Sequence, residues 1–209
     1  MQISTLQQTA SPLAQKNAAH PRLSDDFRQL FIIDSNVPDY QQIVATLPPG
    51  AEVHILDPLA DGLGQISEIL HKVDRGISLH LISHGAPGIL YLGNGTLELH
   101  NLETYTSQLE QWGITDLYIY GCNVAAGDAG AEFIEKLQQI TGATIYANAH
   151  PTGNPELGGT WELRTIQNQA QLDCPLNKEI LAAYPHLLGP TMVKNRPLAK
   201  LKTKTWYNE

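Results

Sequence analysis

Short apolar runs alternate with segments of helical periodicity along most of this chain, and this alternation limits the folds that it can adopt. Each run is only five or six residues long and is followed by polar or small residues. Continuous apolar runs of that length indicate strands that are buried on both faces of a parallel sheet. The runs cover residues 30–34, 52–56, 78–83, 117–121 and 143–147.

The segments between these runs predict helices. Their apolar residues recur with the spacing of one helical face, and they cover residues 35–48, 61–73, 101–112, 128–140 and 177–185. In the fourth of these, we expect Asp128 to be the N-cap and Gly142 to stop the helix.

Two further signals complete the expected fold. Asn94-Gly95 lies between two apolar segments and predicts a β-hairpin. The stretch GGTWELRT, residues 158–165, predicts an edge strand. Strands and helices that alternate through short connections give a mostly parallel sheet with helices on both faces. The sequence therefore predicts an α/β fold.

Composition and charge exclude several classes of protein. The chain has 42% hydrophobic and 16% charged residues, as in globular proteins, and its net charge of −8 argues against a nucleic-acid partner. No apolar run approaches the roughly 18 residues of a membrane span, and residues 1–20 lack the pattern of an export signal. The two cysteines, Cys122 and Cys174, do not make a disulfide framework. We therefore expect free thiols and a cytoplasmic location.

The chain divides into three expected parts. Residues 1–27 form a loose N-terminal arm, residues 28–188 the globular domain, and residues 189–209 a basic tail. The tail could dock on the acidic body, or it could be a solvated terminus. Its basic residues are Lys194, Arg196, Lys200, Lys202 and Lys204.

Two strand ends carry the residues of a nucleophilic site. His84-Gly85 follow one predicted strand, and Cys122 follows another that ends at Gly121. Reactive groups of parallel α/β sheets gather at these ends. A thiol is a strong nucleophile near neutral pH, and an imidazole beside it can lower its pKa or carry its proton. The N–H groups of Gly85 and Cys122 could hold an oxyanion, a contribution of about 3–4 kcal/mol in other enzymes.

An alternative use of these residues is a zinc site. His80 and His84 lie on the same side of one predicted strand, about 13 Å apart, and Cys122 would be a third ligand. No further ligand has compact spacing. We therefore expect no metal ligands.

The strand ending in His84-Gly85 and the later strand ending in Gly121-Cys122 resemble the caspase-like cysteine peptidases of clan CD. The chain also resembles a bacterial, caspase-like domain of unknown function that occurs near the N-termini of large surface or adhesin-like proteins. The matching stretches include LHLISHGAPGILYLGNGTL and LYIYGCNVAAGDAGAEFIEKLQQITGA, and together they span about residues 29–165. The resemblance implies a three-layer α/β/α sandwich.

The resemblance also implies roles for particular residues. Cys122 would be the nucleophile and His84 its partner. Asp34 would line the pocket for the residue before the scissile bond and select Lys or Arg. Asn148 and His150, in ANAHPTG, would border the same pocket, where relatives carry an acidic pair. No cofactor is required, although some members of the clan use calcium.

The resulting hypothesis is a cysteine endopeptidase that cleaves a protein or peptide after a basic residue, with its own C-terminal tail as one candidate substrate. Two alternatives remain open. One is a binding or scaffold module that has kept the fold without activity. The other is a thiol acyltransferase or amidase that uses the same pair on a small substrate.

Overall fold

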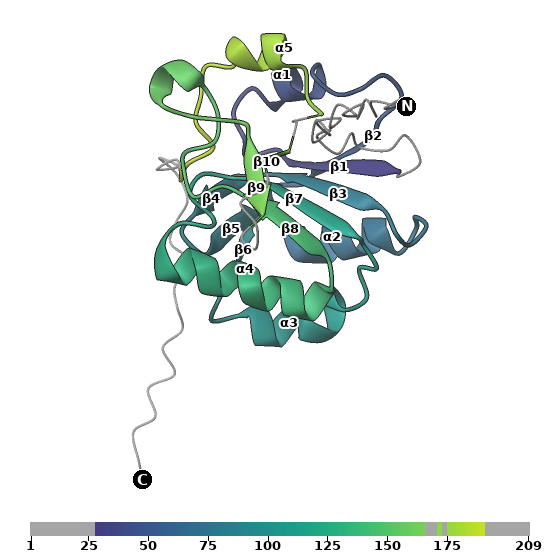
Figure 1. Cartoon of the computed structure of the whole chain (residues 1–209). Coiled ribbons are helices and arrows are strands. Elements are labelled where there is room, and N and C mark those ends of the chain that lie inside the picture. The colour runs from purple at the N-terminus through teal and green to yellow at the C-terminus, as the bar shows by residue number, and fades with distance from the viewer. Residues whose placement is uncertain (1–27, 166–170, 173–174, 191–209) are drawn as a thin grey trace, which may run out of the picture.

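The computed structural model describes residues 28–165, 171–172 and 175–190, and a seven-stranded sheet forms its centre (Figure 1). The strand order is β10-β9-β8-β7-β3-β1-β2. Five strands are parallel: β1 (Gln29–Asp34), β2 (Glu52–Leu56), β3 (Ser78–Ile82), β7 (Asp116–Tyr120) and β8 (Thr144–Ala147). Two strands extend one edge in antiparallel fashion: β9 (Leu163–Thr165) and β10 (Gln171–Leu172).

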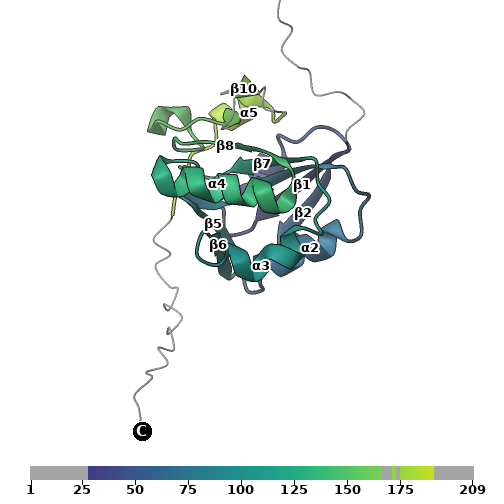
Figure 2. The ribbon, with the colours of Figure 1, turned by 60° about the horizontal axis from the view of Figure 1, so that its bottom comes forward.

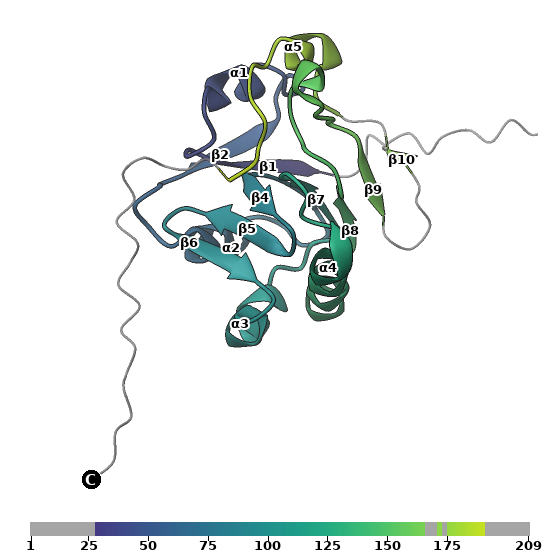
Figure 3. The same cartoon turned by 90° about the vertical axis from the view of Figure 1, so that its left-hand side faces the viewer.

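Helices cover both faces of this sheet. One face carries α2 (Gly62–Leu70), α3 (Leu102–Leu109) and α4 (Gly127–Thr141), and the other carries α1 (Tyr40–Val44) and α5 (Lys178–Ala182) (Figures 2 and 3). The expected three-layer α/β/α sandwich with a mostly parallel sheet is therefore confirmed. The predicted arm and all of the basic tail beyond Pro190 lie outside the described residues.

The path of the chain changes its direction of winding in the middle of the sheet. From β1 the chain moves outward to β2, then crosses over β1 to β3 and continues through β7 to β8. The direction of winding thus reverses between β1 and β3. Open parallel sheets bind their ligands at the carboxyl ends of the strands that flank such a reversal.

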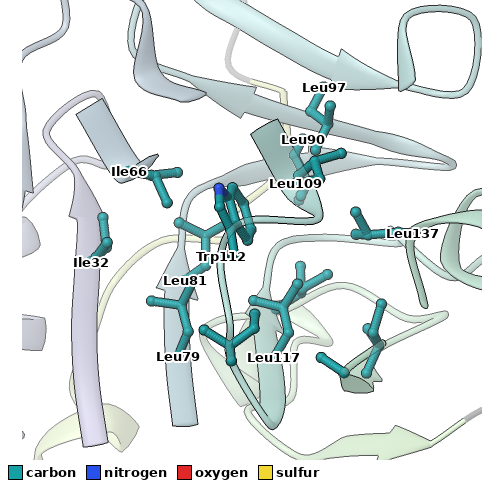
Figure 4. Packing of buried hydrophobic residues seen from close by; sticks show 14 of the residues in the cluster. Ile32, Ile66, Leu79, Leu81, Leu90, Leu97, Leu109, Trp112, Leu117 and Leu137 are labelled. Atoms are coloured by element: carbon teal, nitrogen blue, oxygen red, sulfur yellow. The ribbon is translucent and has the colours of Figure 1, made fainter. Parts of the chain in front are cut away.

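The face under α2, α3 and α4 holds the larger apolar core. Leu79 and Leu81 of β3 point into it, and Trp112 fills the space between the sheet and α2 (Figure 4). The indole N–H of Trp112 donates to Ser67 Oγ at 2.8 Å, so its polar atom is satisfied inside the core. This core fixes the positions of the strands whose ends carry the site.

The opposite face carries a row of stacked rings, which we call the aromatic ladder: Phe31, His80, Tyr118 and Tyr146. These residues are register partners on β1, β3, β7 and β8. Their successive ring centroids lie 4.4, 4.3 and 4.6 Å apart, and all three pairs are stacked. The ladder packs beneath α1 and α5 and ties four strands together across the sheet.

A second, three-stranded sheet follows β3. It consists of β4 (His84–Ala86), β5 (Ile89–Leu92) and β6 (Gly95–Glu98). The predicted hairpin is confirmed, but its two turn residues are Gly93 and Asn94, because Gly95 already pairs with Leu92 as the first residue of β6. The sequence did not predict β4, because a run of only three residues has no periodicity. Only Ser83 separates β3 from β4, so the chain changes sheets directly beside His84.

The ends of α4 differ in part from the prediction. Gly142 ends the helix in a left-handed conformation, φ 70°, as expected. Asp128 is not the N-cap, which is Ala126 without a side-chain hydrogen bond. Asp128 lies in the first turn instead. The helix begins earlier because the Ala126 carbonyl already accepts the first helical hydrogen bond, from the Gly130 N–H at 3.1 Å.

Candidate active site

His84 and Cys122 lie at the ends of neighbouring strands, as predicted. Ile82 of β3 pairs with Tyr120 of β7, and the next N–H, that of Ser83, donates to the Tyr120 carbonyl at 3.1 Å. Directly beyond this pair, β3 is followed by His84 and β7 by Cys122. A Cβ atom on Gly85 would lie 3.0 Å from the Cys122 nitrogen, so only glycine allows this close approach of the two backbones.

The Cys122 thiol is buried and hydrogen-bonded. Only 2% of the residue is exposed. The sulfur accepts a hydrogen bond from the Thr152 N–H at 3.2 Å and donates one to the Thr152 carbonyl at 3.3 Å. Burial raises the pKa of the thiol, and the backbone groups of Thr152 and Leu188 lower it by less. The thiol is therefore protonated at neutral pH in this arrangement.

The His84 imidazole is oriented by a backbone carbonyl. Its Nε2 atom lies 3.1 Å from the Asn36 carbonyl oxygen, in the turn that follows β1. A carbonyl can only accept a hydrogen bond, so Nε2 carries the proton in the neutral ring. The lone pair of the neutral ring is then on Nδ1, which becomes the proton-accepting atom.

Asp34 lies at the end of β1, but its carboxylate is bonded within the protein. One oxygen accepts from the N–H and side-chain amide of Asn36, at 2.7 and 2.8 Å, and the other accepts from the Gly93 N–H at 2.6 Å. Burial is the largest effect on its pKa and raises it. A basic substrate side chain would have to displace these bonds. The geometry instead makes Asp34 a support for the turn that carries the Asn36 carbonyl.

Asn148 and His150 follow β8 and line a cavity that does not include Cys122. Asn148 is buried, its side chain donates to the Glu162 carbonyl at 3.1 Å, and it accepts from the His150 N–H at 3.0 Å. The His150 side chain is exposed. Both residues line a cavity of about 260 Å³ whose lining includes Arg164 but not Cys122. The structure thus brings their backbones near the site but not their side chains to the thiol.

A segment that the sequence did not single out covers the thiol. We call residues 186–190, which follow α5, the closing segment; it descends to the end of β4 (Figure 3). The Leu188 carbonyl accepts two hydrogen bonds, from the Gly85 N–H at 2.9 Å and from the Cys122 N–H at 3.1 Å. These are the two donors predicted for an oxyanion. The short sequence PHLLGP carries no motif that signals this contact.

The alternative zinc site finds no support among the described residues. They contain no group of three His, Cys, Asp or Glu side chains that could hold a metal ion. His80 is fully buried in the aromatic ladder, between Phe31 and Tyr118. The use of calcium stays a prediction.

Fold and site together define a three-layer α/β protein with an imidazole and a thiol at adjacent strand ends. Residues 30–188 match the model of a family described as "Domain of unknown function (DUF4347)", and the chain belongs to that family. No curated protein matches the chain. Within the described part of the chain, no helix has the length and apolar character needed to cross a membrane.

Proposed function

We propose that this protein is a caspase-like cysteine peptidase in which Cys122 is the nucleophile and His84 carries the proton. One observation supports this best: a peptide carbonyl lies against the N–H groups of Gly85 and Cys122, beside the thiol. Donors held at 2.7–3.1 Å from such an oxygen are what acyl transfer requires. An arrangement that receives a peptide carbonyl favours peptide bonds as substrates over small acyl donors.

In the proposed reaction, His84 first takes a proton from Cys122 and later gives it to the leaving amine. The Sγ proton moves to Nδ1 of His84, and the sulfur attacks the carbonyl carbon. The Gly85 and Cys122 N–H groups stabilise the oxyanion. The C–N bond then breaks, and His84 returns the proton to the leaving amine. Water hydrolyses the thioester, which releases the new carboxylate and restores the thiol.

A peptide-library cleavage assay tests this function, run with and without calcium. Wild type and the Cys174→Ser variant should cleave alike. Cys122→Ala should lose about 1000-fold or more of the activity, because it lacks the nucleophile. His84→Ala should also be strongly impaired.

Cleavage that persists in Cys122→Ala would contradict the proposal. A folded wild-type protein that cleaves no peptide, and whose Cys122 reacts with no peptidyl thiol-alkylating probe, would favour a binding module without activity.

A further inference from the structure

We propose that the bond between Leu188 and Gly189 is a substrate of this site, so that the protein cleaves its own chain after Leu188. This inference rests on the function proposed above and adds its substrate. It comes from the closing segment, whose backbone occupies the place that a bound peptide would take.

The closing segment is held as an added strand. The Leu188 N–H donates to the Thr152 carbonyl at 2.8 Å, and the Asn154 N–H donates to the His186 carbonyl at 2.9 Å. Leu187 forms an antiparallel bridge with Gly153 between these two bonds. Addition of an extended segment to an exposed backbone edge is a general way in which proteins bind peptides. Residues 186–188 are thus bound in an extended form to residues 152–154.

The carbonyl at the end of this strand is the one beside the thiol. The Leu188 oxygen lies between the two N–H donors, while the Leu188 nitrogen is fixed by Thr152, the same residue that bonds the sulfur. On the far side of the bond, a Cβ atom on Gly189 would lie 3.7 Å from Sγ. Both residues that flank this peptide bond are therefore placed against the nucleophile, as proximity catalysis requires.

The Leu188 side chain defines an apolar preference. It is fully buried and belongs to the cluster that contains Tyr120, Trp161 and Tyr184. An unpaired lysine or arginine in this cluster would be costly, and the Asp34 carboxylate is already bonded to Asn36 and Gly93. We therefore infer leucine, or another apolar residue of that size, before the scissile bond, in place of the basic residue that the sequence suggested.

Cleavage would consume one water. Leu188 would keep a new carboxylate, and Gly189 would become the N-terminal amine of a fragment that carries the five basic residues of the tail. The match to the family model also ends at Leu188, so the bond lies at the end of the matched region.

Intact-mass analysis of the purified full chain tests the inference, because the masses locate the cleaved bond directly. Wild type should yield fragments 1–188 and 189–209, and Cys122→Ala should keep its full mass. A Cys122-dependent cut after a tail lysine or arginine would overturn the inference but keep the peptidase. A wild-type chain that stays uncut but cleaves added peptides would also overturn the inference and keep the peptidase. An uncut chain without Cys122-dependent peptide cleavage would overturn both.

Variants at Leu188 test the apolar preference. Leu188→Met conserves volume and should be cut at a rate within about tenfold of wild type. Leu188→Lys should be cut at least 100-fold more slowly, and faster cutting of this variant would contradict an apolar pocket. If Leu188→Lys does not fold, wild type can be offered the peptides HLLGP and HLKGP instead. Preferential cleavage of the lysine peptide would also contradict an apolar pocket.

Discussion

His80 and His84 lie four residues apart in the chain and are both buried, but they make different contacts. His84 is bonded to a backbone carbonyl at the end of the sheet. His80 lies inside the aromatic ladder, 3.4 Å from the Tyr120 hydroxyl through its Nδ1 atom. Burial lowers the pKa of His80 from 6.5 to about 3. A backbone carbonyl thus orients the ring of His84, while His80 is a flat, neutral ring in the stack.

The neutral state of His80 predicts a loss of stability in acid. The unfolded chain binds a proton at His80 below pH 6.5, whereas the folded chain binds it only near pH 3. Stability is therefore lost as the pH falls between these values. At pH 4.5 the loss from this group should be about 2–3 kcal/mol relative to pH 7.

The variant His80→Phe, which keeps a stacking ring, should remove this contribution. Urea unfolding of both proteins at pH 7 and pH 4.5 measures it. An exposed control, His71→Phe, should keep the wild-type pH dependence. Equal losses in wild type and His80→Phe would contradict a neutral, buried imidazole.

At the scale of elements, the turn after β1 connects the two sheets to His84, the proposed partner of Cys122. The Asp34 carboxylate bonds both to Asn36 in this turn and to Gly93 at the β5–β6 turn. The side-chain amide of Asn36 also donates to the Gly93 carbonyl at 3.1 Å. The backbone carbonyl of Asn36 accepts the hydrogen bond from His84 Nε2. The position of the imidazole therefore depends on a contact between turns of two different sheets.

We predict that Asp34→Asn lowers kcat more than it changes KM. An amide offers one acceptor oxygen to three N–H donors, so one donor loses its partner at a cost of about 1–3 kcal/mol of stability. The turn then holds the Asn36 carbonyl less firmly against His84. Steady-state kinetics with a leucine peptide and thermal unfolding measure the two effects.

Asp57→Asn is the matched control, because Asp57 follows β2 and its carboxylate accepts a local hydrogen bond from the Leu59 N–H at 2.8 Å. It should leave kcat unchanged. If Asp34→Asn instead raised only KM, and only for peptides with lysine or arginine before the scissile bond, Asp34 would be the specificity residue that the family resemblance implies.

At the scale of the molecule, the C-terminal part of the domain closes over the N-terminal part. The Tyr184 hydroxyl donates to the Pro38 carbonyl at 2.8 Å, and His186 Nε2 lies 2.8 Å from the Asp39 carboxylate. These contacts join segments almost 150 residues apart and lead the closing segment to Cys122. Docked in this way, the closing segment covers the buried thiol.

Gly153→Ala should open the site. A Cβ atom there would lie 2.3 Å from the His186 carbonyl, and the φ of 130° disfavours any other residue. The closing segment should be displaced, and alkylation of Cys122 by iodoacetamide should accelerate by at least about tenfold, which corresponds to about 1.4 kcal/mol in the opening equilibrium. Peptide mapping separates this reaction from that of Cys174.

Gly158→Ala provides the control for backbone strain. Gly158 also has a positive φ, 81°, but nothing lies within 4 Å of the added Cβ. It should leave the rate of Cys122 alkylation unchanged. Equal acceleration in both variants would mean that general destabilisation, rather than displacement of the closing segment, exposes the thiol.

The local pattern of the sequence determined the strands and helices of the central fold and the neighbouring positions of His84 and Cys122. The apolar runs and helical spacings predicted the central strands and the five helices, with some ends shifted, as at Asp128. The rule for strand ends then put His84 beside Cys122. Such signals are readable because each depends on residues close together in the chain.

Only the tertiary structure decided what surrounds these two residues. The bonds of the Asp34 carboxylate to Gly93 and of the Leu188 carbonyl to Gly85 both end on a backbone N–H group far away in the sequence, and backbone N–H groups are the same in every residue except proline. No residue type therefore marks them in advance. The sequence by itself placed a thiol and an imidazole at one end of the sheet, and packing decided that the Leu188 carbonyl of the same chain would accept the N–H groups of Gly85 and Cys122 beside the thiol.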